Sequence, residues 1–272
     1  MNEVKYISED SFFKKYKSRK IDLVKEGFFS KKDIEEIQEI DNMLSMGDKV
    51  NTLVSYLKFS FRYPFFINSF LIPQVKQRLE KLLFNKSKIP WENGNLVRTN
   101  NLKARIATAF KPQTILEIGT YLGVGAATFK YNLPKSTIYT MSPKNTSGSN
   151  NPVFFEYLGF FYKKKQIKVK QIWADSTMYD YTKLPKIDFT YIDGNHEFEY
   201  VYSDLKKTSD ITTRCVLVDD YIPIAQARNG DLVFGPWNEG VVRATDRFLK
   251  ENRSLFKEAY WIKGSKFCIL IK

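Results

Sequence analysis

Short apolar segments rich in β-branched and aromatic residues alternate with helical patterns from about residue 96 to residue 272. This alternation is typical of an α/β domain, because each buried parallel strand needs a crossover helix before the next strand. Strands are expected at residues 114–118, 137–141, 167–174, 188–193, 215–219, 256–262 and 266–271. Only Lys263, Gly264 and Ser265 separate the last two, which is too short for a crossover helix. The sequence therefore predicts a seven-stranded, mainly parallel sheet that ends in an antiparallel hairpin.

The first part of the chain, residues 1–95, lacks strand alternation and is predicted to be a helical region that precedes an α/β domain of residues 96–272. Ser30 and Asp33 are spaced as in a capping box and indicate the start of one amphipathic helix. The aromatic-rich segment 53–83 suits helices that form a lid, bind a substrate or contact a second subunit, so a homodimer is expected. A membrane-surface patch is the alternative for this segment.

The chain carries 43 Lys and Arg against 30 Asp and Glu, a formal net charge of +13. Such a surplus can attract nucleic acid, an anionic membrane or a phosphorylated substrate. The basic residues are spread along the chain, however, and only segment 163–170 is dense, so a solvated surface is the favoured interpretation of that segment. We therefore do not expect nucleic acid as a partner.

Several features of the sequence bear on the cellular compartment in which the protein is expected. The apolar stretch 63–75 is about 13 residues long, whereas a spanning helix needs about 20. The first residues do not form a secretory signal. The two cysteines, Cys215 and Cys268, are too few for a disulfide framework and are expected to be buried thiols. We therefore expect no transmembrane segment and a cytoplasmic location.

The most informative segment is a buried strand that runs into a glycine-rich turn and a helix. Residues 117–125 read Glu-Ile-Gly-Thr-Tyr-Leu-Gly-Val-Gly. Glycine lets a backbone approach a ligand closely, and the N-terminus of the following helix offers unpaired N–H groups with about half a positive charge. A ligand with carboxylate or other acceptor oxygens is expected here. The spacing differs from the G-x-G-x-x-G of dinucleotide-binding folds, which disfavours NAD.

Two later strands end in acidic residues. The first ends at Asp193 and is followed by His196, and the second ends at Asp219 and Asp220. Open α/β sheets bind ligands at the carboxyl ends of their strands, so the three carboxylates are expected at one edge of the sheet. Three hard oxygen ligands suit Mg²⁺ or a similar divalent cation.

These motifs together resemble the class I S-adenosylmethionine (SAM)-dependent methyltransferases, whose first motif is E/D-x-G-x-x-x-G-x-G. The acidic strand ends look like those of the metal-dependent O-methyltransferase branch that includes macrolide-sugar O-methyltransferases and cephalosporin-cluster proteins. The resemblance covers about residues 100–272, including 235–248, which is similar to a helix of that branch. It implies a Rossmann-like fold and methyl transfer from SAM to a hydroxyl of a sugar or other small molecule, including a phosphorylated one.

The resemblance also implies a role for each matching residue. Asp193, Asp219 and Asp220 would be the metal ligands. The catalytic residues would be Asp193 and His196, the histidine as a general base or substrate contact, with a structural role as its alternative. The cofactor-binding residues would be Glu117, Gly119, Tyr121, Gly123, Gly125, Ser142, Asp175 and Ser176.

The chain departs from the family pattern in two places. Ser142 stands where the family usually has an acid that holds the ribose hydroxyls. A hydrogen bond to a charged group contributes about 1.5–3 kcal/mol and a neutral one about 0.5–1.5 kcal/mol, so cofactor binding would weaken by about tenfold. Segment 212–215 also replaces the usual glycine-rich turn before the fifth strand.

Two alternatives stay open at the level of sequence. Ser142 and the unassigned region 1–95 are compatible with a catalytically silent binding protein of the same fold. The net charge is compatible with an RNA methyltransferase, although the fourth strand lacks the Asn/Asp-Pro-Pro-Tyr/Phe cluster of enzymes that methylate amino groups. The identity of the acceptor does not follow from the sequence.

Overall fold

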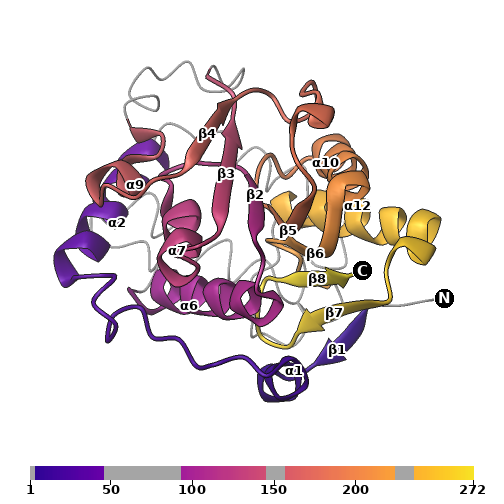
Figure 1. The fold of residues 1–272 in the computed structure, drawn as a ribbon, viewed down its shortest axis with the longest axis horizontal. Helices are drawn as coiled ribbons and strands as arrows, with labels where there is room; N and C mark the ends of the chain where they lie inside the picture. The colour runs from indigo at the N-terminus through magenta and orange to yellow at the C-terminus, as the bar shows by residue number, and fades with distance from the viewer. Residues whose placement is uncertain (1–3, 46–92, 145–156, 224–235) are drawn as a thin grey trace, which may run out of the picture.

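The computed structural model describes residues 4–45, 93–144, 157–223 and 236–272. Within them a single sheet of eight strands runs in the order β1-β7-β8-β6-β5-β2-β3-β4 (Figure 1). The strands are β1 (Lys5–Ile7), β2 (Thr114–Ile118), β3 (Thr137–Ser142), β4 (Lys170–Trp173), β5 (Ile187–Ile192), β6 (Thr212–Val218), β7 (Glu258–Ile262) and β8 (Cys268–Ile271). The adjacent strands from β4 to β6 are parallel, and β8 is antiparallel to both β6 and β7. The predicted α/β fold, with its parallel sheet and C-terminal hairpin, is confirmed.

The eighth strand, β1, corrects the prediction that residues 1–95 lack strands. Lys5–Ile7 pairs in parallel with β7 at the edge of the sheet, with Lys5 opposite Tyr260. Alternation over three largely exposed residues is too short to distinguish a strand from a coil. Pairing with β7, which is distant in sequence, is what makes this segment a strand.

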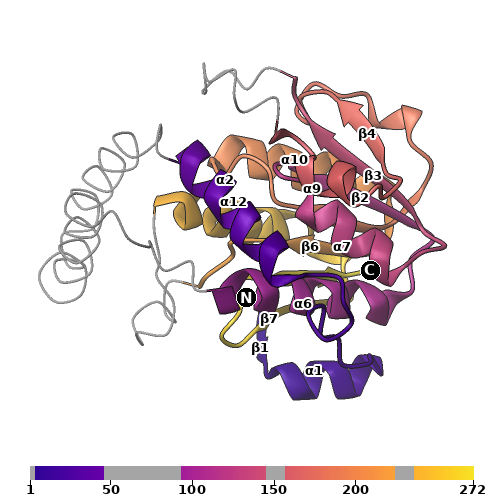
Figure 2. The ribbon, with the colours of Figure 1, turned by 90° about the vertical axis from the view of Figure 1, so that its left-hand side faces the viewer.

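Helices cover both faces of the sheet (Figures 1 and 2). They are α1 (Glu9–Tyr16), α2 (Lys31–Ser45), α6 (Asn93–Phe110), α7 (Val124–Asn132), α9 (Phe160–Lys164), α10 (Phe198–Ile211) and α12 (Pro236–Asn252). The first five share one hydrophobic cluster with the sheet, and α10 and α12 pack in a second cluster against it. This three-layer arrangement buries both sides of the central strands, which explains why those strands read as continuous apolar runs.

The described part of residues 1–95 packs onto the sheet domain. Phe12 and Phe29 belong to the same buried cluster as Phe129 and Phe189. The predicted aromatic segment 53–83 and the first residue of segment 235–248 lie outside the described residues. The division into two regions, 1–95 and 96–272, stays a prediction.

The start of α2 confirms the predicted capping box and explains part of the basic segment. The Ser30 N–H donates to Asp33 Oδ2 at 2.9 Å, and the Asp33 N–H donates to Ser30 Oγ at 3.1 Å. Asp33 also pairs with Lys164 at 3.0 Å and Lys165 at 2.7 Å. These two lysines of segment 163–170 are therefore balanced within the chain.

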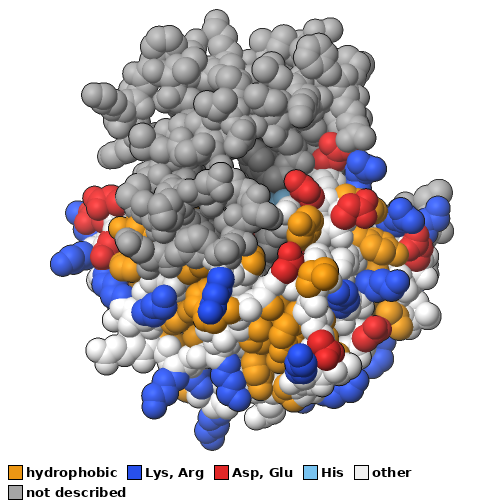
Figure 3. Space-filling model, turned by 90° about the horizontal axis from the view of Figure 1, so that it is seen from above, with side chains coloured by type: hydrophobic (Ala, Val, Ile, Leu, Met, Phe, Trp, Pro, Cys, Tyr) orange, Lys and Arg blue, Asp and Glu red, His pale blue; other side chains and the backbone are white. Residues whose placement is uncertain are grey.

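Charges of both signs are intermingled on the face seen in Figure 3. Among the described residues, no helix is both long and apolar enough to cross a membrane. Both cysteines, Cys215 and Cys268, are buried thiols, as expected.

Candidate functional site

The carboxyl ends of three neighbouring strands, β2, β5 and β6, form one edge. The Asp193 N–H donates to the Ile118 carbonyl at 2.8 Å, and the Asp219 N–H donates to the Ile192 carbonyl at 3.0 Å. These bonds continue the ladder one residue beyond each strand. The glycine turn after β2 and the acidic residues after β5 and β6 therefore lie side by side, at the position where the chain order of the strands reverses.

Two glycines of the turn allow close contacts with the protein itself. Gly119 has a φ of +101°, and a Cβ there would lie 1.9 Å from the Asp193 carbonyl oxygen. At Gly125 a Cβ would lie 2.0 Å from Glu117 Oε1. At Gly119, the backbone of the turn after β2 therefore packs directly against the backbone at the end of β5. The second leaves room for the Glu117 carboxyl beneath the first turn of α7. The expectation that these glycines also admit a cofactor stays a prediction.

Glu117 is a deeply buried carboxyl, only 1% exposed. Thr140 Oγ1 donates to its Oε2 at 2.6 Å. Burial raises the pKa of Glu117 to about 8, although the charge of Lys103 and the bond from Thr140 oppose this increase. At neutral pH this carboxyl is therefore mostly protonated.

Tyr121 and Gly123 occupy the loop between β2 and α7. Tyr121 is 39% exposed, and its hydroxyl donates to Asp41 Oδ1 of α2 at 2.7 Å. Gly123 is the N-cap of α7, and a Cβ there would lie 2.5 Å from the ring of Tyr162. The described contacts of both residues thus hold the turn against α2 and α9. Their predicted contact with a cofactor is not tested by these contacts.

Lys103 of α6 is a site residue that the sequence motifs do not include. It is 5% exposed, and its Nζ lies 4.2 Å from the centroid of the Tyr191 ring. The same Nζ is 3.4 Å from the position that a Cβ on Gly125 would occupy. Lys103 lies in the helix before the glycine motif, and a single lysine there has no distinguishing pattern.

Tyr191 connects two of the acidic residues. Its hydroxyl donates to Asp193 Oδ2 at 2.6 Å and also contacts Asp219 Oδ2. Asp219 Oδ1 accepts the N–H of Asp220 at 2.7 Å. Burial and then the charge of Asp193 raise the pKa of Asp219 to about 6. Tyr191 of β5 comes two residues before Asp193, which directly follows the strand, so period-two alternation could have indicated that the two side chains share a face.

His196 lies between the other carboxylate oxygens of the site. Its Nε2 is 3.7 Å from Asp193 Oδ1 and 3.6 Å from Asp220 Oδ2. The atom is buried and has no hydrogen-bond partner among the described residues. Burial lowers the pKa of His196, but the carboxylates of Asp193 and Asp220 outweigh it, so the net shift is upward. The imidazolium form is thus favoured by its neighbours.

Asp220 has partners of its own. Lys266 Nζ lies 2.5 Å from its Oδ1, and Asn238 Nδ2 donates to its carbonyl at 2.7 Å. Its φ of +53° is left-handed, which is uncommon for a residue with a side chain. This backbone conformation and the Lys266 contact fix the carboxylate at the edge of the site.

The three predicted metal ligands converge, but they are not arranged as a metal cage. Asp219 Oδ2 contacts the Tyr191 hydroxyl, its Oδ1 accepts the N–H of Asp220, and one oxygen of Asp220 is bound by Lys266. Within the described part of the chain, no group of three or more His, Cys, Asp and Glu residues has an arrangement that could hold an ion.

The predicted nucleoside-binding residues lie on the other side of the glycine turn. Ser142 is buried at the end of β3, and its carbonyl accepts the N–H of Ala174 at 3.1 Å. Asp175 Oδ1 accepts from the N–H of Thr177 at 2.8 Å. Burial raises the pKa of the buried Asp204 carboxyl to about 7, and the nearby Ser176 opposes this increase.

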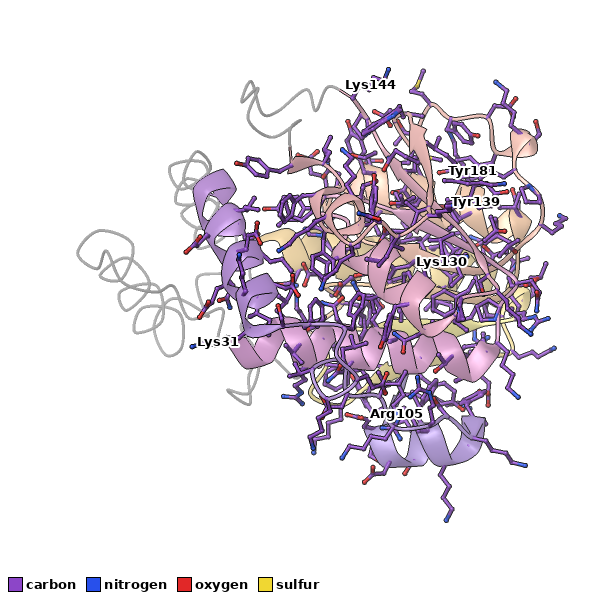
Figure 4. The ribbon with its side chains drawn as sticks, turned by 60° about the vertical axis from the view of Figure 1, so that its left-hand side comes forward. Lys31, Arg105, Lys130, Tyr139, Lys144 and Tyr181 are labelled. Atoms are coloured by element: carbon purple, nitrogen blue, oxygen red, sulfur yellow. The ribbon has the colours of Figure 1, made fainter. Side chains whose placement is uncertain are left out.

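Aromatic residues support these strand ends. Tyr181 is buried in a third hydrophobic cluster, and Tyr139 of β3 packs against the same cluster (Figure 4). The ends of β3 and β4 are therefore held by packing that is separate from the acidic edge.

Comparisons with known proteins support the fold. No protein-family model matches the sequence, and no curated protein has a matching sequence. Among solved structures, a Staphylococcus aureus protein provisionally named a caffeoyl-CoA O-methyltransferase is similar at 12% identity and a TM-score of 0.50, covering 74% of this chain and 99% of that one. An S-adenosylhomocysteine (SAH)-bound methyltransferase from Podospora anserina is 19% identical with a TM-score of 0.46, covering 75% and 96%. An O-methyltransferase from Bacillus cereus in complex with SAH is 12% identical with a TM-score of 0.46, covering 77% and 96%.

At these identities a structural likeness bears on the fold alone. The first of these similarities has a TM-score of 0.50 and covers 74% of this chain. The chain therefore has the Rossmann-like fold of the SAM-dependent O-methyltransferases.

Proposed function

We propose that this chain is a SAM-dependent O-methyltransferase that uses His196, assisted by Asp193, to accept the proton of a substrate hydroxyl. One observation supports this function above the others. His196 Nε2 is buried without a hydrogen-bond partner among the described residues, and it lies between two carboxylates. The backbone of Asp193 packs closely against Gly119. His196 and its two flanking carboxylates therefore lie next to the glycine turn that is predicted to bind the cofactor.

The residues at this edge fit SAM chemically. The N-terminus of α7 has no side-chain cap, and the ammonium of Lys103 is buried beside it. Both suit a ligand that carries a carboxylate. Ser142 and Asp175, at the ends of neighbouring strands β3 and β4, offer polar groups for a nucleoside. When bound, SAM supplies an electrophilic methyl group, and its sulfur keeps the electrons of the broken carbon–sulfur bond.

The chain's own residues would manage the proton. Starting from the neutral imidazole, His196 Nε2 would take the proton of the acceptor oxygen as that oxygen bonds to the methyl carbon. Asp193 Oδ1 and Asp220 Oδ2 flank that nitrogen and stabilise the imidazolium that forms. Tyr191 and Lys266 hold these two carboxylates in position. The reaction balances as an ether, a neutral thioether and one proton on the histidine.

The finer predictions from the resemblance concern the acceptor, the metal and the assembly. A sugar or other small-molecule hydroxyl, including a phosphorylated one, is the acceptor class that we propose. No step of the proposed reaction depends on Mg²⁺, because the carboxylates contact Tyr191 and Lys266 instead of forming a cage. Magnesium dependence and a homodimer stay predictions. Magnesium dependence is tested by measuring activity after chelation and again after Mg²⁺ is restored.

The cofactor part of the proposal is tested by titrating SAH into the protein in a calorimeter. We expect binding at a ratio of one per chain, weakened by the serine at position 142. No heat and no thermal shift at millimolar SAH would refute the proposal.

The reaction is tested with a panel of sugars, nucleotide-linked sugars and catechols, with SAH release as the readout. We expect His196→Gln to lose most of the turnover on the best acceptor while SAH affinity stays within about threefold. An exposed variant, Lys31→Met, serves as the control. SAH binding without release on any acceptor would favour the catalytically silent binding protein.

A further inference from the structure

The turn of the C-terminal hairpin lies at the same edge of the sheet as the acidic residues. Because β8 is antiparallel to both β6 and β7, the strands β6 and β7 end at the same edge. The Tyr221 N–H, which follows β6, donates to the Lys266 carbonyl in the turn at 2.9 Å. Lys266 Nζ contacts Asp220, whose Oδ2 lies 3.6 Å from His196 Nε2. The hairpin turn therefore borders the candidate site.

A basic residue of α6 meets this turn. Arg98 is exposed, and its Nη2 lies 3.9 Å from the position that a Cβ on Gly264 would occupy. Gly264 directly follows Lys263, which is also exposed, and comes two residues before Lys266. Two segments that are remote in the chain thus bring basic residues to one part of the sheet edge.

The two elements carry positive charge only. Their basic residues are Arg98, Lys103 and Arg105 of α6 and Lys263 and Lys266 of the turn 263–267. Neither α6 nor the turn contains Asp or Glu, so acidic partners must come from elsewhere in the chain. The charges of these residues therefore add up unless other segments or a ligand balance them.

Other segments balance some of these charges but not all. Arg105 and Lys266 each form an ion pair with an acidic residue from another segment. The side chains of Arg98 and Lys263 make no hydrogen bond or ion pair with any residue that the structure describes. Their donors and charges are therefore open to an anion at the border of the site.

The chemistry of these two side chains suits a phosphate group. A guanidinium presents a planar fork of N–H donors that matches two phosphate oxygens at once, and an ammonium adds a compact positive charge. Lys266, whose ammonium is held by Asp220, lies between this position and His196 along the contacts described above. A ligand with a phosphate at Arg98 could therefore place a hydroxyl toward His196.

We infer that Arg98 and Lys263 bind a phosphate group of the acceptor, which is accordingly a phosphate ester of a small hydroxyl compound. This inference rests on the proposed function and narrows its acceptor class. The phosphate would fix one end of the acceptor at the hairpin turn, and the hydroxyl to be methylated would lie at the other end.

The experiment titrates inorganic pyrophosphate into the protein at constant ionic strength. Binding is followed by calorimetry and by the NMR signal of the single histidine. The samples are the wild type, Arg98→Met, Lys263→Met and the exposed control Lys31→Met (Figure 4). We expect the wild type and the control to bind equally and the His196 resonance to shift as the site fills. Arg98→Met and Lys263→Met should each bind about tenfold more weakly, because each loses a charge-assisted contact.

The outcomes separate this inference from the function on which it rests. A wild type that does not bind pyrophosphate, or that binds it no more tightly than Arg98→Met, overturns the phosphate site. Binding that depends on Arg98 but leaves the His196 resonance unmoved overturns the assignment to the acceptor, because the anion then lies away from the site. If one variant does not fold, the other decides. SAH titration of the same samples tests the proposed function, and a wild type that binds pyrophosphate but not SAH refutes that function while the phosphate site stands.

Discussion

Replacing Gly119 with alanine tests the contact that joins the glycine turn to the acidic edge. The new Cβ would lie 1.9 Å from the Asp193 carbonyl oxygen, 2.5 Å from the Asp193 carbonyl carbon and 3.0 Å from Gly194 Cα. All three are backbone atoms, so no side chain can rotate away. The ends of β2 and β5 would have to separate by roughly 1.5 Å to reach an ordinary contact distance.

The cost has two parts. The φ of +101° is unfavourable for a residue with a side chain, at about 1–3 kcal/mol. Forcing packed backbone apart adds about 1–3 kcal/mol. The sum, about 2–6 kcal/mol, is a large share of a typical unfolding free energy of about 5–15 kcal/mol. For a chain of this size each kcal/mol lowers Tm by about 2–4 °C, so we expect a decrease of about 5–20 °C.

Gly27→Ala provides the matched control. Gly27 has a φ of +75°, and nothing lies within 4 Å of its Cβ position, so it bears only the backbone cost. Thermal unfolding followed by circular dichroism measures both variants, and SAH titration of folded Gly119→Ala reports on the site. If the two variants lose the same stability, the close approach between Gly119 and Asp193 is wrong.

Three further predictions concern titration and the N-terminal packing. Because burial raises the pKa of Glu117 to about 8, from about 4.5 when unfolded, wild-type stability should fall as pH rises between these values. Glu117→Gln should gain Tm relative to wild type from pH 5 to pH 8.5, and an unchanged difference would argue against a buried neutral carboxyl. The chain has one histidine, so a single NMR resonance reports His196, whose pKa should exceed the usual value of about 6.5 and fall in Asp193→Asn. A value unmoved by that substitution would remove the carboxylate from the mechanism. Asp33→Ala removes the carboxylate half of the α2 capping box and the ion pair with Lys165, and should lower the unfolding free energy in urea by about 2 kcal/mol; a loss below about 0.5 kcal/mol would show that α2 does not depend on it.

Local signals made much of the fold predictable. The apolar strands could be located because both faces of a parallel strand are buried, and the hairpin because three residues cannot contain a crossover helix. The capping box at Ser30 and Asp33 is also local, with both partners within one helical turn. β1 was missed because its three residues become a strand only through pairing with a segment more than 250 residues away.

The acidic half of the site was predictable for a related reason. Parallel strands end at a common edge, so the sequence alone predicts that Asp193, Asp219 and Asp220 lie together. Their chemical surroundings could not. Lys266 comes from the hairpin and Lys103 from α6, and neither has a local pattern that indicates a site.

The sequence by itself determined the class of fold, the edge of the sheet that carries the chemistry and the acidic groups at that edge. These depend on periodicity and on strand direction, which neighbouring residues encode. Only the tertiary structure decided which cations meet those carboxylates, that His196 Nε2 lies between two of them, and that Glu117 is deep enough to hold its proton. The physical reason is that charge balance and desolvation depend on distances between segments remote in the chain, and packing sets those distances.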